Sequence, residues 1–301
     1  MRHGKYPFII GFLVAPVALY ATFVLWPYVQ TILLSFKFWR GFGKSRWIGF
    51  DNYRRMWNDD RFWQALSHHG VLLLALPLIT IAIALVFAFL LNVGGDSRGG
   101  RLRGVWGSKL YRVVFFLPQV LAIPIIAVLF QMVYRPNESG LINGFLIKAG
   151  LDPIGFLINK NLAFPSIIGV LVWQAVGFYV VLFSAGMASI PSDIYEAAAL
   201  DGANRLTLFF RVTLPLLWDT VQVAWVYLGI AAFDAFAIVQ VLAQDYGGPD
   251  GATTVLGLEI YSNMQQSRNG YAAALGVVLC LLALTFAALT LRVTRRESYE
   301  Y

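Results

Sequence analysis

A few polar and aromatic side chains lie inside long apolar runs, where they could contact a polar solute. Trp173, Gln174 and Phe178 fall within the run at 163–188. An aromatic ring beside an amide can stack on the flat face of a solute and bind its hydroxyl groups. Aromatic residues in such runs also serve simply to pack helices. Both interpretations of these three residues stay open.

Asp234 lies deep in the next apolar run, at 216–243. An unpaired charge at membrane depth costs about 2.5–3.5 kcal/mol, so such a carboxylate needs a function or a partner. It could accept hydrogen bonds from a solute, or it could be a structural contact to a companion subunit. Gln240 lies six residues further on, which is about 600° of helical rotation. It would therefore not share the face of Asp234, and is a weaker candidate or a contact to a neighbouring helix.

The polar segment at 189–215 connects these two apolar runs. Its sequence predicts a short helix, a glycine break, a second short helix and a proline. Asp193 can act as N-cap with Glu196 three residues on, and Gly202 supplies the backbone freedom that ends a helix. Asn204 can cap the second helix, and Pro215 suits the first turn of the run that follows. So well defined an element between two apolar runs is expected to dock a partner.

Sequence signals of catalysis, metal binding and nucleotide binding are missing. The glycine-rich stretch at 95–100 has no lysine after it and reads as a flexible turn rather than a phosphate-binding loop. His3, His68 and His69 have no third ligand at metal spacing, and the adjacent pair is expected to be solvated in a polar loop. Cys280 is the single cysteine, which excludes a disulfide framework and a cysteine metal site. We therefore expect no catalytic residue, no metal site and no cofactor bound by this chain.

The composition predicts an all-α polytopic membrane protein. Hydrophobic residues make up 58% of the 301 residues and charged residues only 13%, whereas soluble domains are about 25% charged. The net charge of +7 is explained better by basic residues that flank apolar spans than by nucleic-acid binding. Six runs reach the roughly 20 residues needed to cross a bilayer. The spans are predicted near 7–36, 71–93, 111–134, 163–188, 216–243 and 271–292, in one transmembrane domain at 1–301.

The first run follows the basic residues Arg2 and Lys5 and resembles the start of a signal peptide. It is too long for a cleaved apolar region, so we expect a retained signal-anchor helix. Lysines and arginines are shared almost equally between the two sides, but the short, dense clusters at 98–112 and 292–296 favour cytoplasmic termini.

The connecting segment contains Glu-Ala-Ala, then Gly, a β-branched residue and Leu-Pro at fixed spacing. In this chain the pattern is Glu196, Ala197, Ala198, Gly202, Val212, Leu214 and Pro215. It resembles the signature loop of permease subunits of bacterial ABC importers, with one departure at Val212, where the family most often has isoleucine.

Other stretches are similar to the larger-half permease of carbohydrate importers of the maltose and glycerol-phosphate type. They are Trp47–Tyr53, Phe116–Pro118, Tyr134–Asn143, Ser189–Pro191, Gly247–Pro249 with Thr253 and Thr254, and Gly270–Ala274. Two extra residues before Gly247 depart from the family pattern.

The resemblance implies a type I importer permease fold with a cytoplasmic coupling helix, in a bacterial or archaeal inner or plasma membrane. It implies that an ATPase docks on Glu196, Ala197, Ala198, Asp201, Gly202, Leu214 and Pro215. The expected partners are a second homologous permease, two ATP-binding subunits that hold ATP and Mg, an extracytoplasmic solute-binding protein or lipoprotein, and membrane lipid. A secondary transporter would instead need ion-coupling residues and internal repeats, and a membrane-embedded enzyme would need a cluster of catalytic groups.

Overall fold

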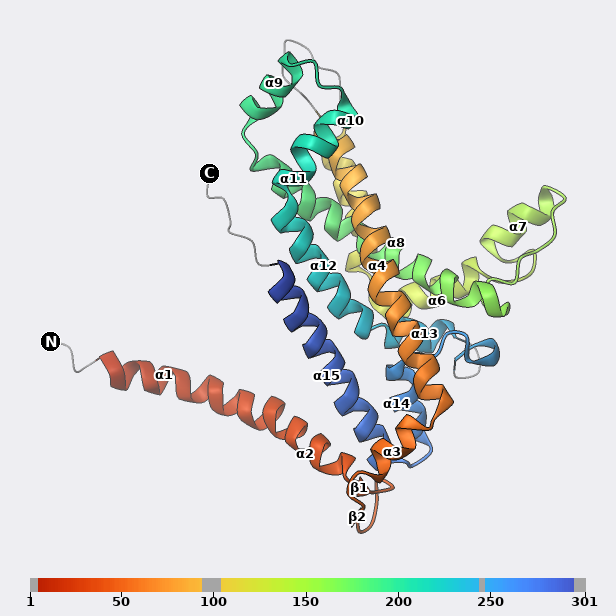
Figure 1. Cartoon of the computed structure of the whole chain (residues 1–301). Helices are drawn as coiled ribbons and strands as arrows, with labels where there is room; N and C mark the ends of the chain where they lie inside the picture. Colours follow the sequence, from red (N-terminus) through yellow and green to blue (C-terminus); the bar gives the residue numbers. More distant parts are fainter. Residues whose placement is uncertain (1–4, 94–103, 244–246, 295–301) are drawn as a thin grey trace. The chain divides into compact units, whose positions relative to one another are not determined.

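The computed structural model describes residues 5–93, 104–243 and 247–294, and their regular secondary structure is helical apart from two short strands (Figure 1). The predicted turn at 95–100 and His3 lie outside the described residues. The chain folds as two compact units. One comprises residues 1–63 and 259–282, and the other comprises residues 64–258 and 283–301. The single domain expected at 1–301 stays a prediction.

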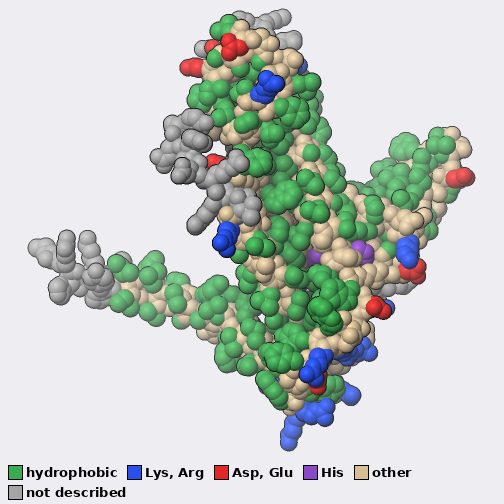
Figure 2. Space-filling model, viewed as in Figure 1, with side chains coloured by type: hydrophobic (Ala, Val, Ile, Leu, Met, Phe, Trp, Pro, Cys, Tyr) green, Lys and Arg blue, Asp and Glu red, His purple; other side chains and the backbone are tan. Residues whose placement is uncertain are grey.

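The first unit begins with a long helical run. It consists of α1 (Lys5–Tyr20), the π-helix η1 (Ala21–Leu25) and α2 (Trp26–Ser35). Between Ile9 and Ser35 it is long and apolar enough to cross a membrane, and none of its most apolar stretch is buried. Hydrophobic side chains cover it in Figure 2. An apolar helix without an inward face suits contact with lipid or another membrane protein.

A small polar segment follows α2. Strand β1 (Lys37–Phe38) pairs antiparallel with β2 (Arg46–Trp47), and α3 (Asp51–Trp57) comes next. The amide of Asn52 donates to the carbonyl oxygens of Ser35 at 2.8 Å and Lys37 at 3.1 Å, which fixes α3 against the end of α2. Lysine and arginine side chains gather around these strands in Figure 2.

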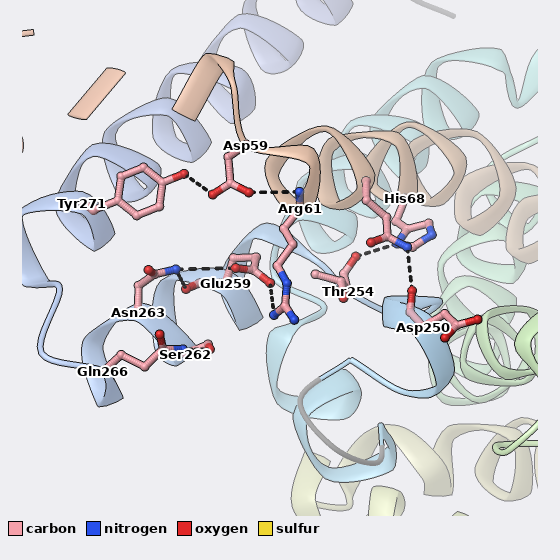
Figure 3. Close-up of polar contacts among 11 residues, drawn as sticks. Asp59, Arg61, His68, Asp250, Thr254, Glu259, Ser262, Asn263, Gln266 and Tyr271 are labelled. Atoms are coloured by element: carbon pink, nitrogen blue, oxygen red, sulfur yellow. Dashed lines mark hydrogen bonds and ion pairs between the residues drawn. The ribbon is translucent and has the colours of Figure 1, made fainter. Parts of the chain in front are cut away.

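A charged cluster joins the beginning of α4 (Asp60–Val93) to α14 (Leu256–Gln265) and α15 (Asn269–Thr294) within the same unit (Figure 3). The Tyr271 hydroxyl donates to Asp59 at 2.7 Å, and the Arg61 guanidinium lies 3.8 Å from the Glu259 carboxylate. The cluster borders a cavity of about 710 Å³ lined by Arg55, Asn58, Asp59, Asp60, Arg61, Glu259, Asn263, Gln266 and Arg268.

The second unit contains the hydrophobic core, residues 256–258 of α14, residues 283–294 of α15 and the other helices. They are the greater part of α4, α5 (Ser108–Val120), α6 (Ile123–Val133), α7 (Leu141–Lys148), α8 (Lys160–Ala188), α9 (Ser192–Leu200), α10 (Arg205–Thr207), η2 (Leu208–Thr213), α11 (Leu214–Leu216), α12 (Trp218–Phe233), α13 (Phe236–Leu242) and η3 (Pro249–Gly251). Helix α8 supplies much of the core, including the fully buried Phe183. It lies so close to α5 that a Cβ atom at Gly177 would collide with the Phe115 carbonyl group.

Four helical segments among the described residues could each cross a membrane, and bent helix pairs supply up to two more. Helices α5 and α6 meet at 100°, with Leu121 and Ala122 in extended conformations. The segment from Arg205 to Leu216 meets α12 at 71°. The six predicted spans therefore overlap four helical segments and two bent pairs, and the fifth predicted span, 216–243, overlaps its bent pair only over residues 216–233.

The expectation of continuous helix across 216–243 is wrong. Leu217 separates α11 from α12, and a second interruption at Asp234 and Ala235 separates α12 from α13. The second predicted span also begins earlier than expected, because α4 starts at Asp60. His68 and His69 therefore lie in a helix and not in a solvated polar loop, and His69 is only 1% exposed.

Candidate functional site

The segment at 189–215 folds into two short helices separated by a glycine turn, as predicted. Helix α9 ends at Leu200, and Gly202 adopts a left-handed φ of +80°. The Gly202 N–H donates to Ala199 O at 3.1 Å, and the Ala203 N–H donates to Ala198 O at 3.0 Å. These two bonds form a Schellman motif, in which glycine is favoured because it has no Cβ atom to strain the turn.

The capping predictions for this segment have different outcomes. Asn204 caps α10 as predicted, because its side chain accepts from the Thr207 N–H at 2.8 Å. The prediction that Pro215 lies in the first turn of the next apolar helix is wrong, because Pro215 belongs to the short α11 and α12 begins only at Trp218. The prediction that Asp193 caps α9 is wrong. The helix begins at Ser192 with Pro191 at the N-cap, so Asp193 lies inside the first turn, where its charge favours the positive helix end.

Tyr195 connects α9 to η2 within this segment. Its side chain is buried, and its hydroxyl lies 3.3 Å from the Thr213 hydroxyl in η2. Burial raises the pKa of Tyr195 above its ordinary value, and the hydrogen bond to Thr213 opposes this. The sequence did not predict a role for Tyr195, because its spacing from neighbouring residues does not indicate that its side chain is buried.

The predicted docking residues differ in exposure. Ala197, Asp201, Gly202 and Pro215 are exposed, whereas Glu196, Ala198 and Leu214 are half-buried. Three apolar side chains not predicted for docking are also exposed: Leu200 at 89%, Leu206 at 69% and Phe210 at 60%. These large apolar side chains are open to contact with a partner. In Figure 1, α9 and α10 lie together at the end of α8 and α12 that is distant from α13.

Glu196 borders a small cavity behind α9. The cavity is about 270 Å³ and is lined by Asn92, Val93, Met187, Ala188, Ile190, Ser192, Tyr195 and Glu196. Beside it, the Arg112 guanidinium donates to the Asn92 side chain at 2.7 Å, and the Asn92 amide donates to the Ser184 hydroxyl at 3.0 Å. These bonds join α5, α4 and α8 next to the segment at 189–215.

A second cavity lies between the helices, at the break after α12. It measures about 310 Å³ and is lined by Leu76, Gln119, Ile123, Leu171, Gln174, Ala175, Phe178, Tyr179, Tyr227, Leu228, Ala231, Asp234, Ala235 and Ile238. Three of the five predicted solute-path residues therefore border one cavity: Gln174, Phe178 and Asp234. An aromatic ring, an amide and a carboxylate around a partly apolar space can bind a hydroxyl-rich solute.

The other two predicted residues lie elsewhere. Trp173 is not among the cavity residues, and its ring packs edge-on against Phe130 at 5.1 Å. Gln240 is half-buried in α13, also outside the cavity lining. The position of Gln240 relative to Asp234 cannot be obtained from a helical rotation of 600°, because the helix does not continue through Asp234.

Sequence reasoning missed three polar residues of this cavity, Gln119, Tyr179 and Tyr227. Gln119 lies next to the extended break between α5 and α6, which brings it to the cavity. Tyr227 lies on α12, seven residues before Asp234. That spacing of about two helical turns places both residues on one face, and this signal could have identified Tyr227.

Comparison of the sequence with protein families and known proteins indicates the family of this chain. Residues 93–299 match the family described as "Binding-protein-dependent transport system inner membrane component". The chain is 40% identical over 300 residues to the diacetylchitobiose uptake system permease protein NgcF of Streptomyces coelicolor, covering 98% of this chain and 84% of that protein. It is 30% identical to the multiple sugar-binding transport system permease protein MsmF of Streptococcus mutans, covering 95% and 94% of the two chains.

Among solved structures, the fold matches a chain of a bacterial alginate ABC transporter in complex with an alginate pentasaccharide-bound periplasmic protein. The TM-score is 0.78 at 24% identity, over 97% of this chain and 96% of that chain. At that identity the match supports the fold alone. Together with the family match and the relatives, it shows that this chain belongs to the binding-protein-dependent transport system inner membrane components, as a permease subunit of an ABC importer.

Proposed function

We propose that this subunit forms half of the path for a sugar or sugar derivative, and that the cavity at Asp234 is where the solute contacts it. The observation that carries the proposal is the placement of Gln174, Phe178 and Asp234 around one cavity. Two of these residues lie on α8, and Asp234 directly follows α12. The segment at 189–215, which is proposed to dock the ATPase, connects the same two helices. Movement of that segment would therefore change the cavity directly.

The remaining parts of the transporter are proposed from the family. A second, homologous permease completes the path, and an extracytoplasmic solute-binding protein delivers the solute. Two ATP-binding subunits hold ATP and Mg and dock on α9 and the turn at Gly202. Closure of these subunits would move the docked helices as rigid bodies and switch the cavity between the two sides of the membrane. Both termini are proposed to lie in the cytoplasm of a bacterial or archaeal cell.

The relatives guide the choice of solute for a test. The name of the 40% identical relative contains diacetylchitobiose, and that of another relative contains lactose. We therefore propose an uncharged oligosaccharide as the substrate class, with diacetylchitobiose as the first probe. Such a solute presents hydroxyl groups for Asp234 and Gln174 and a ring face for Phe178.

The test is uptake of labelled sugar into proteoliposomes that contain the whole transporter and its binding protein. Asp234→Ala is expected to reduce uptake by about tenfold, because losing a hydrogen bond to a charged group costs about 1.5–3 kcal/mol. Asp219→Asn is the matched control, since this exposed acid lies in the first turn of α12, outside the cavity lining. Assembly and basal ATP hydrolysis should persist in both variants.

Two results would contradict the proposal. If Asp234→Ala prevents the two permeases from co-purifying, the carboxylate is an assembly contact. If uptake persists without ATP and stops when a protonophore collapses the ion gradient, ATP hydrolysis does not drive transport through this path.

A further inference from the structure

The buried residue His69 connects two segments that lie far apart in the sequence. Its Nε2 atom accepts a hydrogen bond from the Leu256 N–H at 3.1 Å. Its ring also stacks on Phe233, with ring centres 5.5 Å apart and planes inclined by 28°. One imidazole therefore contacts both the first residue of α14 and the last residue of α12.

The hydrogen bond fixes the chemical state of this ring. An imidazole nitrogen that accepts a hydrogen bond carries no proton, so His69 is neutral with its proton on Nδ1. The first N–H groups of a helix have no partner inside the helix, so the Leu256 N–H needs an acceptor from elsewhere. His69 supplies that acceptor in a buried setting, where an unpaired N–H would cost about 1–3 kcal/mol.

The Phe233 contact reaches the edge of the proposed solute cavity. Phe233 is buried and ends α12, and Asp234 follows it directly at the helix break. The Asp234 N–H still donates to Ala231 O at 3.0 Å, so this residue is held at the last turn of α12. A shift of the Phe233 ring would therefore move the backbone that carries the Asp234 carboxylate.

The neighbouring His68 has different contacts and offers a matched control. Its Nδ1 atom lies 2.6 Å from Thr254 O, a contact drawn in Figure 3, and its ring lies 4.5 Å from that of Phe164. The carbonyl can only accept, so Nδ1 of His68 is the donor. His68 thus holds the segment before α14 without stacking on the residue that precedes Asp234.

We propose that His69 is a positioning residue for solute binding. It holds the end of α12 against the start of α14 and thereby sets the place of the Asp234 carboxylate in the cavity. This inference rests on the proposed function of Asp234.

Two substitutions separate the two contacts of His69. His69→Phe keeps an aromatic ring against Phe233 but removes the hydrogen-bond acceptor. His69→Gln keeps an acceptor for the Leu256 N–H but removes the ring. In sugar uptake by the assembled transporter, each should raise the half-saturating sugar concentration by about threefold or more, the size of a typical coupling between contacting residues. His68→Phe should leave that concentration unchanged.

The amount of assembled complex, measured for each variant, distinguishes positioning from a general effect on folding. If the His69 variants lower maximal uptake only in proportion to the assembled complex, at an unchanged half-saturating concentration, the inference is wrong. Asp234→Asn is measured in the same series. If it raises the half-saturating concentration while the His69 variants do not, only this inference fails. If Asp234→Asn has no effect either, the proposed solute cavity fails as well. Should His69→Phe not assemble, Phe233→Leu tests the stacking from the other side.

Discussion

At the scale of single residues, Glu259 is unusual because its carboxylate is buried with incomplete partners. It is 5% exposed, its ion pair with Arg61 is long at 3.8 Å, and Asn263 donates to it at 3.5 Å. Burial raises the pKa of Glu259; Arg61 acts in the opposite direction, and Asp59 adds to the increase. The charged form therefore costs folding free energy at this position.

This shift predicts a pH dependence of stability. Between the ordinary pKa of 4.5 and the raised value, the folded state binds more protons at Glu259 than the unfolded state does. The contribution of this residue to stability is therefore full below pH 4.5 and declines as pH rises through the folded pKa. Glu259→Gln should flatten that part of the thermal stability profile of the purified complex.

Asp51→Asn serves as the control for this measurement. Asp51 pairs with Arg54 at 3.6 Å with both side chains well exposed, so its removal should change the profile little. A Glu259→Gln profile that keeps the full decline above pH 4.5 would show that another group causes it.

Single residues also show where prediction from the sequence reached its limit. Asp234 stood out because a charge is rare in an apolar run, and the structure places it at a cavity. His69 was misjudged because it comes just before the apolar run predicted to begin at residue 71, and its burial depends on Phe233 and Leu256, which are more than 160 residues away. A one-sequence pattern contains no information about such distant contacts.

At the scale of elements, two glycines form the same turn in different places. Gly202 follows α9 and Gly150 follows α7, with φ values of +80° and +78°, and both have open space where a Cβ atom would lie. The Gly150 N–H donates to Ile147 O and the Leu151 N–H to Leu146 O, which repeats the Schellman pattern at Gly202. A substitution should cost about the same local free energy at each site.

This pair tests whether the turn at Gly202 docks the ATPase subunits. Gly202→Asp is expected to release the ATPase subunits from the purified complex and to abolish uptake, whereas Gly150→Asp should retain both. Each substitution strains the left-handed backbone by roughly 1 kcal/mol, so the difference reports docking. Equal retention of the ATPase by the two variants would show that the turn at Gly202 is not needed for docking.

A charge reversal on α9 tests the same element independently. Glu196→Lys should weaken ATPase association and reduce uptake at least about tenfold, because Glu196 borders the cavity behind α9. Asp193→Lys, on the exposed first turn, should have a smaller effect. ATPase pulled down by each variant gives the measurement, and undiminished binding by Glu196→Lys would refute the assignment.

Elements were predicted well where local chemistry decides them. Gly202 determines where α9 ends, and Asn204 determines where α10 begins. Both roles depend on neighbouring residues only. The breaks at Leu121 and Asp234 were not predicted, because the apolar run continues on both sides of each break. Such a break is tolerated in a membrane where other helices or a cavity satisfy the freed backbone groups.

At the scale of the whole molecule, the distribution of basic residues bears on orientation. Seven lysines and arginines lie between Lys37 and Arg61 on the side proposed to be external. Several have structural partners within their own unit: Arg54 pairs with Asp51, Arg61 pairs with Glu259, and Arg55 lies 4.7 Å from the centre of the Tyr271 ring. Local contacts explain why these basic residues lie in this segment. Their number on the proposed external side is therefore weaker evidence against cytoplasmic termini.

Reporter fusions test this orientation across the chain. With cytoplasmic termini and six crossings, a reporter inserted within 98–108 or placed after Arg296 should show cytoplasmic activity, and one within 137–150 should show external activity. We expect this pattern because α5 and α6, although bent by 100°, would cross the membrane as one span. If that pair instead entered and left on one side, the 98–108 and 137–150 fusions would report the same compartment. An external signal at 98–108 would overturn the six-span topology and, with it, the cytoplasmic position of the docking segment.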